Sequence, residues 1–246
     1  MDPAVLREDM VDSLEHEAKG FVESDRVGIA MRTVPREAFV DEERSAYEDR
    51  DLEHQGSRVL SPSSVARLLE ALSAEEDDDV LVVGAGVGYT AAVLAEIVGE
   101  PNVHAIDIDR RLVLTARSNL AEAGYGGVLV DRRDGADGLP EYASYDRVLL
   151  EAAAVRPPRA LLDQLADDGR LVMPSGNRQQ TLVAVDRDGK VRDRFGPVRF
   201  EPLLVSGEET SAIERNRTVR EDRERAERAN ERRKGWEHDW IDWDGV

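Results

Sequence analysis

The chain has 246 residues, of which 52 are acidic and 33 are basic, for a formal net charge of −19. This excess of acid argues against nucleic-acid binding through bulk charge, because phosphate contacts need Lys and Arg. The chain has no cysteine, which excludes disulfides, thiolate metal sites and a cysteine nucleophile. No apolar run approaches the ~20 residues of a membrane span, and no signal-peptide pattern opens the chain, so we expect a soluble, cytoplasmic protein.

Only three of the basic residues are lysines, namely Lys19, Lys190 and Lys234. An acid-rich, lysine-poor surface suits a salt-saturated cytoplasm, where salt screens the self-repulsion of the net charge. A GC-rich genome would also favour Arg over Lys. Because Asp and Glu are inflated as well, we interpret the composition as halophilic.

Apolar periodicity predicts two helices near the N-terminus, over residues 5–20 and 25–33, and Pro35 ends the second. Residues 34–60 show no regular pattern. Ser61 and the polar residues after it can cap a helix over about 64–73. Strands and helices then alternate. The predicted strands cover residues 79–83, 103–107, 127–130, 145–150 and 169–174, and the predicted helices cover 88–98, 109–123 and 157–166.

This alternation indicates a mostly parallel twisted sheet with helices on both faces, a Rossmann-like α/β fold. A turn at Asp188 and Gly189 predicts an antiparallel hairpin near the C-terminal edge, between residues 182–185 and 191–195. Residues 198–205 are predicted to form a last strand. We therefore place one domain over residues 1–206, with N-terminal helices and a loop in 1–73 and the sheet in 74–206.

Residues 207–246 differ in composition from the rest of the chain. They hold many charges and few apolar residues, which predicts a solvated helix or a partly disordered tail. All three tryptophans lie at its end, at positions 236, 240 and 243. We expect this end to cover an apolar patch of the chain's own domain, and a dimer or partner contact is the alternative.

The strongest motif is the glycine-rich stretch that follows the predicted strand 79–83. It reads Gly84-Ala85-Gly86-Val87-Gly88-Tyr89, and glycines are needed where the chain turns sharply and a ligand approaches the backbone. Position 89 is Tyr rather than the last Gly of the dinucleotide fingerprint, and no Gly-Lys-Ser/Thr of a P-loop is present. The spacing fits a ligand with an adenosine and no phosphates.

Two acids follow the next strands in the order that such a ligand requires. Asp107, next to Ile108, ends a predicted strand and can accept hydrogen bonds from both ribose hydroxyls. Asp134 can accept from an adenine amino group, and Gly135 lets the backbone approach the ring. Alone, Asp107 could simply be an exposed acid at a strand end. Together these residues predict a site for S-adenosyl-L-methionine.

Over nearly all of residues 10–206 the chain resembles the protein-L-isoaspartate O-methyltransferases, a family of class I methyltransferases. Two pieces are more specific than the glycine loop, namely V-P-R-E-A-F-V at 34–40 and A-Y-E-D at 46–49. Further matches are Y-T-A-A-V-L-A at 89–95, D-G at 134–135, Y-D-R at 145–147, A-A-A at 152–154 and P-L at 202–203. The resemblance implies methyl transfer from S-adenosyl-L-methionine to the free α-carboxylate of an isoaspartyl residue, which begins protein repair.

The chain departs from the family pattern at two places. Val82 stands where the family usually has Glu before the glycine loop. The family's substrate loop, Gly-x-Gly-Gln-Thr-Ile-Ser-Gln-Pro, reads here as Q-G-S-R-V-L-S-P over residues 55–62. A single deletion places the family's substrate-contacting serine at Ser61, whereas counting back from Val65 places it at Leu60. We favour Ser61, although an N-cap of the following helix is the structural alternative.

Methylating a carboxylate needs no general base, because the acceptor is ionised at neutral pH. We therefore expect catalysis without a metal, by a neutral hydroxyl such as Ser61 that orients the acceptor. The four histidines are far apart in sequence and make no convincing metal site. We expect a monomer whose partners are isoaspartyl proteins and peptides. The altered loop at 57–61 leaves two alternatives open, a class I methyltransferase with a different acceptor or a cofactor-binding protein that has lost turnover.

Overall fold

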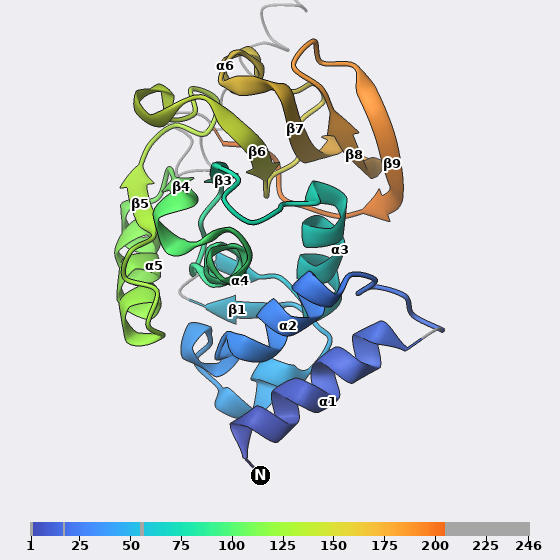
Figure 1. The fold of residues 1–246 in the computed structure, drawn as a ribbon, viewed down its shortest axis with the longest axis vertical. Helices are drawn as coiled ribbons and strands as arrows, with labels where there is room; N and C mark the ends of the chain where they lie inside the picture. Colours follow the sequence, from blue (N-terminus) through green and yellow to red (C-terminus); the bar gives the residue numbers. More distant parts are fainter. Residues whose placement is uncertain (1, 17, 55–56, 205–246) are drawn as a thin grey trace, which may run out of the picture. The chain divides into compact units, whose positions relative to one another are not determined.

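The computed structural model describes residues 2–16, 18–54 and 57–204. In this part of the chain, seven strands form one sheet in the order β5-β4-β3-β6-β7-β8-β9. The first five of these strands are parallel to their neighbours, and β8 and β9 are antiparallel. Figure 1 shows the sheet running from β5 and β4 beside α5 to the β8–β9 hairpin. The predicted Rossmann-like fold with a C-terminal antiparallel hairpin is therefore confirmed.

The strands of this sheet are β3 (Val80–Val83), β4 (Val103–Asp107), β5 (Leu129–Arg132), β6 (Tyr145–Leu150), β7 (Leu165–Gly176), β8 (Gln180–Val185) and β9 (Val191–Val198). The helices are α1 (Pro3–Glu15), α2 (Asp25–Thr33), α3 (Pro62–Leu72), α4 (Tyr89–Val98), α5 (Arg110–Glu122) and α6 (Arg159–Asp163). Short 3₁₀ helices cover Arg36–Phe39, Glu43–Tyr47, Glu100–Asn102 and Pro140–Tyr142. A separate hairpin pairs β1 (Leu52–His54) with β2 (Ser57–Val59).

Alternate residues of the central strands contribute to two hydrophobic cores. Val80 and Val82 of β3 join the core that also contains residues of α1 to α5, whereas Leu81 and Val83 join the core that contains Leu161 and Leu162 of α6. Both faces of β3 are therefore covered, which explains why its four residues are all apolar and buried. The carboxyl ends of these buried strands are held rigidly.

Several predicted boundaries are wrong. The first helix ends at Glu15 rather than residue 20, because the chain turns at His16 and the Phe21 N–H donates to the Leu14 carbonyl. The strand predicted at 127–130 lies at Leu129–Arg132, in register with β4. The helix predicted at 157–166 shortens to Arg159–Asp163 because Leu165 pairs with Tyr145 and so begins β7.

The predicted last strand over 198–205 is also wrong within the described residues. Strand β9 itself extends to Val198, and residues 199–204 contain only an isolated bridge between Ala153 and Pro202. The described residues of 34–60 include two 3₁₀ helices and the strands of the β1–β2 hairpin, although the sequence shows no regular pattern there. The predicted tail, 207–246 with its three tryptophans, lies outside the described residues.

Packing between the first two helices is fixed by charge as well as apolar contact. Arg32 of α2 pairs with Asp12 at 2.6 Å and with Glu15 at 2.7 Å on α1. Figure 1 shows α1 and α2 together at the end of the molecule nearest the N-terminus, next to β1. No helix among the described residues is both long and apolar enough to span a bilayer.

Candidate functional site

The glycine loop links β3 to α4, and its three glycines lie in different surroundings. Gly84, Gly86 and Gly88 all have positive φ, at 97°, 53° and 95°. A Cβ on Gly88 would lie 3.2 Å from the Leu120 side chain and 3.3 Å from the Ala116 carbonyl oxygen, so Gly88 allows α5 to pack closely. A Cβ on Gly86 would meet nothing nearer than 4.0 Å. The space over Gly86 is therefore open.

Asp107 ends β4 and lies against this loop. Its Oδ2 accepts a hydrogen bond from the Gly86 N–H at 3.0 Å, and its Oδ1 accepts one from the Asp109 N–H at 2.9 Å. The residue is 9% exposed, and burial raises the pKa of its carboxyl although these backbone bonds oppose the shift. Ile108 follows at the same edge, and its carbonyl accepts from Arg132 Nε at 3.1 Å. The carboxylate thus fixes the loop and keeps further lone pairs for ligand hydroxyls.

Asp134 and Gly135 lie after β5, one strand further along. The Asp134 side chain accepts from the Ala136 N–H at 2.9 Å, which closes a tight turn. A Cβ on Gly135 would lie 2.6 Å from the Val83 side chain and 3.0 Å from that of Leu203, so only glycine fits there. Because β5, β4 and β3 are consecutive in the sheet, the structure brings the predicted residues to neighbouring strand ends. We call Gly84–Tyr89, Asp107, Ile108, Asp134 and Gly135 the strand-end cluster.

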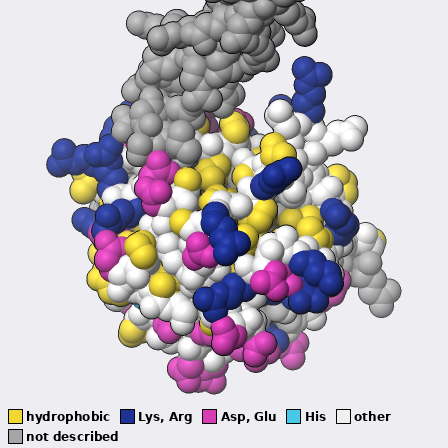
Figure 2. Space-filling view, turned by 90° about the horizontal axis from the view of Figure 1, so that it is seen from above, with side chains coloured by type: hydrophobic (Ala, Val, Ile, Leu, Met, Phe, Trp, Pro, Cys, Tyr) yellow, Lys and Arg dark blue, Asp and Glu magenta, His cyan; other side chains and the backbone are white. Residues whose placement is uncertain are grey.

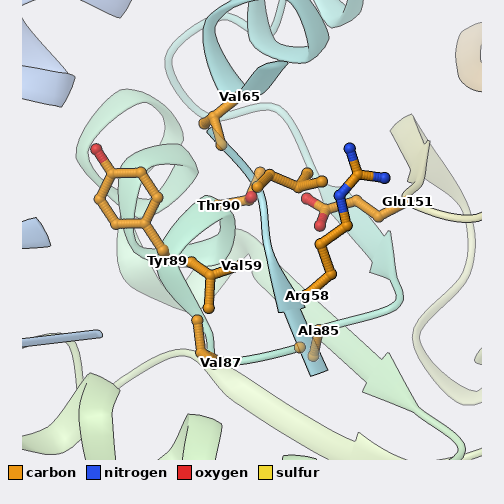
Figure 3. A pocket seen from close by; sticks show the side chains of 10 residues that line it. Arg58, Val59, Val65, Ala85, Val87, Tyr89, Thr90 and Glu151 are labelled. Atoms are coloured by element: carbon orange, nitrogen blue, oxygen red, sulfur yellow. The ribbon is translucent and has the colours of Figure 1, made fainter. Parts of the chain in front are cut away.

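A pocket opens between the glycine loop and the segment before α3. The residues that line it are Arg58, Val59, Leu60, Val65, Ala85, Gly86, Val87, Tyr89, Thr90 and Glu151. Figure 3 shows Val59 and Arg58, which precede α3, on the same pocket as Ala85 and Val87 of the glycine loop. The irregular segment therefore contributes one wall of the site.

The buried side chain of Arg36 connects separate parts of the chain before α3. Its side chain is fully buried, its Nε donates to the Ala46 carbonyl at 2.7 Å, and its Nη2 donates to the Leu60 carbonyl at 2.6 Å. The guanidinium lies 4.5 Å from the centre of the Tyr89 ring. Through these contacts Arg36 brings V-P-R-E-A-F-V and A-Y-E-D into contact with the tyrosine of the glycine loop. We call residues 34–61, which Arg36 organises, segment 34–61.

Ser61 is the N-cap of α3, as the structural alternative predicted. Its Oγ accepts from the Ser64 N–H at 3.3 Å, and its own N–H donates to Asp51 Oδ1 at 2.9 Å. It is 7% exposed and is not among the residues that line the pocket, whereas Leu60 is. The role of Ser61 toward an acceptor stays a prediction.

Glu151 and Thr90 line the pocket although the sequence analysis missed them. Glu151 follows β6 directly, as Asp107 ends β4, and this position at a strand end was the signal that could have found it. Burial raises the pKa of the Glu151 carboxyl to about 7, against a hydrogen bond from Thr90 that lowers it. At the position of the family's usual Glu, Val82 is 1% exposed and lies within the core.

The described residues contain no group of three or more His, Cys, Asp or Glu side chains placed to hold a metal ion. Within the same ranges the site is instead a set of backbone amides, carboxylates and hydroxyls around a glycine loop. Such a set can bind and orient an adenosine-containing ligand by hydrogen bonds.

Comparison with known proteins gives consistent results. A family model described as protein-L-isoaspartate(D-aspartate) O-methyltransferase matches residues 6–208. A protein-L-isoaspartate O-methyltransferase of Methanosarcina mazei is 40% identical over 206 residues, which are 81% of this chain and 83% of the relative. One from Roseiflexus sp. is 42% identical over 210 residues, 83% of this chain and 94% of the relative.

A crystal structure shows the same fold. It is that of a putative protein-L-isoaspartate O-methyltransferase from Plasmodium falciparum in complex with S-adenosyl-L-homocysteine. The match has a TM-score of 0.71 at 21% identity and covers 80% of this chain and 98% of that one.

Proposed function

The chain belongs to the protein-L-isoaspartate(D-aspartate) O-methyltransferase family, and from this premise we propose how its own residues divide the work of methyl transfer. The enzyme uses S-adenosyl-L-methionine and methylates the free α-carboxylate of L-isoaspartyl residues in damaged proteins. The single observation that carries the assignment of residues is the convergence of the glycine loop, Asp107 and Asp134 at consecutive strand ends.

The strand-end cluster fits the methyl donor. A Cβ on Gly86 would occupy the open space over the loop, and Asp107 keeps lone pairs for the two ribose hydroxyls. Asp134 accepts from the adenine amino group, and Gly135 lets its backbone approach the ring. When bound, S-adenosyl-L-methionine supplies an electrophilic methyl group on a sulfonium. The protein's task is to hold the reacting atoms in line and to exclude water.

Ser61 orients the acceptor carboxylate in this proposal. A neutral hydroxyl can hydrogen-bond to a carboxylate without the repulsion that another acid would bring. Three observations support the placement. Ser61 directly follows the pocket-lining Leu60, its N–H is fixed by Asp51, and Arg36 anchors the Leu60 carbonyl. The acceptor needs no general base because it is already ionised near neutral pH.

We also propose that residues 1–206 form the complete catalytic unit, acting as a monomer in the cytoplasm. The family match over residues 6–208 supports this boundary. The face in Figure 2 mixes basic with acidic side chains rather than presenting one basic patch, which supports protein rather than nucleic acid as the partner. The halophilic interpretation stays a prediction, and it implies that the melting temperature rises steeply from low salt to molar KCl.

A peptide pair tests the function. The protein in molar KCl is given S-adenosyl-L-methionine with an isoaspartyl peptide, or with the same peptide containing a normal aspartyl residue. We expect methyl ester on the isoaspartyl peptide alone, and binding of S-adenosyl-L-homocysteine by calorimetry. Binding without methylation of either peptide would support a cofactor-binding protein that has lost turnover.

A further inference from the structure

Glu151 is a partly buried acid in the pocket, and one of its carboxylate oxygens has no partner. Its Oε1 is inaccessible to solvent and accepts no hydrogen bond, whereas Thr90 hydrogen-bonds to the same carboxyl. Figure 3 shows the Glu151 carboxylate reaching across the pocket toward the side where Thr90 lies. An unpaired buried carboxylate oxygen is costly. Its position therefore indicates a cationic or hydrogen-bond-donating ligand.

The place of Glu151 in the sheet indicates which part of a ligand it meets. The strands run in the order β5-β4-β3-β6, and three acids stand at or just after their carboxyl ends, Asp134 after β5, Asp107 at β4 and Glu151 after β6. Neighbouring strands are about 4.8 Å apart, so β4 and β6 are separated by about 10 Å. A donor with its adenine at Asp134 and its ribose at Asp107 places its methionyl part near β3 and β6.

The methionyl part carries a positively charged α-ammonium group, which a carboxylate in the pocket can bind. We propose that the Glu151 carboxylate binds the α-ammonium of the donor's methionyl group and so makes the site specific for the complete amino-acid portion. The proposal rests on the proposed function, because it assumes the donor's placement over Asp107. Glu151 would thus be a binding and specificity residue at the end of β6, a strand that no glycine motif follows.

The charges around Glu151 leave it available for this role. Arg58 lines the same pocket, but its guanidinium bonds to the Asp51 carboxylate and the Arg199 carbonyl. Asp107 is the other acid that acts on Glu151, and its charge raises the pKa of Glu151 further. From α4, Thr90 donates a hydrogen bond and Tyr89 lines the pocket. Among the residues that line the pocket, only Glu151 has a carboxylate.

A pH dependence follows from burial. In the free protein the Glu151 carboxyl, with its pKa raised to about 7, is half protonated near neutral pH. Binding an ammonium requires the ionised form. Affinity for a ligand with an α-ammonium should therefore be greatest near pH 8, where this group still carries its proton, and fall by up to about tenfold per pH unit below pH 7.

The test compares two ligands that differ only beyond the sulfur, S-adenosyl-L-homocysteine and 5′-methylthioadenosine. The second lacks the amino-acid portion. In Glu151→Gln we expect affinity for S-adenosyl-L-homocysteine and for S-adenosyl-L-methionine to fall about 10- to 100-fold. Affinity for 5′-methylthioadenosine should change less than about twofold. Glu75→Gln, at an exposed residue paired with Arg26, is the matched control and should change neither.

The pH profile supplies a second readout. Wild-type affinity for S-adenosyl-L-homocysteine should decline from pH 8 to pH 6, and Glu151→Gln should lose this decline. 5′-Methylthioadenosine lacks the α-ammonium, so a decline that is larger for S-adenosyl-L-homocysteine reports on the site that binds this group.

Three outcomes would overturn the proposal. Equal weakening of both ligands would mean that Glu151 only shapes the pocket, and an unchanged affinity would mean that it meets no ligand. Loss for S-adenosyl-L-methionine alone would place the carboxylate at the sulfonium instead of the ammonium. Failure of the wild type to bind either ligand would instead contradict the proposed placement of the donor. The test therefore distinguishes an error in the role of Glu151 from an error in the proposed function.

Discussion

The glycine loop of the strand-end cluster and residues 58–60 of segment 34–61 contribute two walls of one pocket, yet the two regions are held in place by different interactions. In the cluster, each functional residue stands at or just after the end of a parallel strand, and backbone ladder bonds set the position of that strand. In segment 34–61, one buried side chain, Arg36, binds carbonyls that are 10 and 24 residues away. The position of the cluster is therefore set by many backbone bonds, whereas that of segment 34–61 depends on a few side chains.

The largest effect is expected at Arg36. Arg36→Met keeps a long side chain but loses two hydrogen bonds from a charged donor, each of which contributes about 1.5–3 kcal/mol. We expect the free energy of unfolding to fall by about 3 kcal/mol or more. At a temperature where the variant stays folded, isoaspartyl methylation should drop at least about tenfold, while affinity for S-adenosyl-L-homocysteine stays near wild type.

Arg50→Met is the matched control for this variant, since Arg50 lies in the same segment with a side chain 56% exposed. The stability of Arg50→Met in denaturant melts, its calorimetric affinity for S-adenosyl-L-homocysteine and its methylation rate should all stay near the wild-type values. If Arg36→Met weakened donor binding as much as methylation, the two walls would not be separable as described.

The next effect concerns the donor wall. Asp107→Ala should weaken binding of S-adenosyl-L-methionine by about 1.5–3 kcal/mol, because it removes a charged acceptor and frees the Gly86 and Asp109 N–H groups. Asp131→Ala removes an acid from the adjacent β5 that pairs with Arg117 and should bind normally. An unchanged dissociation constant for Asp107→Ala would remove this residue from the site.

A truncation tests whether both walls are complete within residues 1–206. Removing the residues after Gly207 should keep donor affinity and most of the turnover. If Trp236 and Trp240 cover an apolar patch, the free energy of unfolding should fall by about 1–3 kcal/mol. Melting temperature and binding of S-adenosyl-L-homocysteine measure the two effects. Loss of binding would mean that the tail completes the donor wall.

The smallest stability effect is expected at Ser61, where the cap and the acceptor contact can be separated. Ser61→Ala should cost about 1 kcal/mol of stability by removing the N-cap, whereas Ser61→Asn keeps a capping side chain. Both variants should lower kcat/KM for the isoaspartyl peptide and leave donor affinity unchanged. Full turnover in Ser61→Asn would assign Ser61 to the helix cap alone.

The same contrast explains what the sequence could predict. Strands 103–107 and 145–150 are predicted to the residue, because each is a short stretch with buried apolar residues between clear helix or turn signals. The residues of the strand-end cluster are also predicted from the sequence, because a glycine or an acid directly after a predicted strand can be recognised locally. Glu151 follows the same pattern but lies in no motif, and only its place in the pocket lining, with an inaccessible Oε1, distinguishes it from a surface acid.

Segment 34–61 could not be predicted in this way. Its order comes from Arg36, Asp49 and Asp51, which bond to backbone groups of Ala46, Leu60, Ser61 and Ser63. Such side chain to backbone bonds leave no periodicity in the sequence. The resemblance to the family identified the motifs, but the structure was needed to show that they meet at one arginine.

We propose that the donor binds on the strand-end cluster and the acceptor on segment 34–61, next to each other. A crystal structure of the wild type with S-adenosyl-L-homocysteine and an isoaspartyl peptide would show both placements at once. We expect the ribose hydroxyls on Asp107, the adenine amino group on Asp134 and the acceptor carboxylate on Ser61, facing the sulfur. A peptide carboxylate bound away from Leu60 and Ser61, or a ribose away from Asp107, would contradict it.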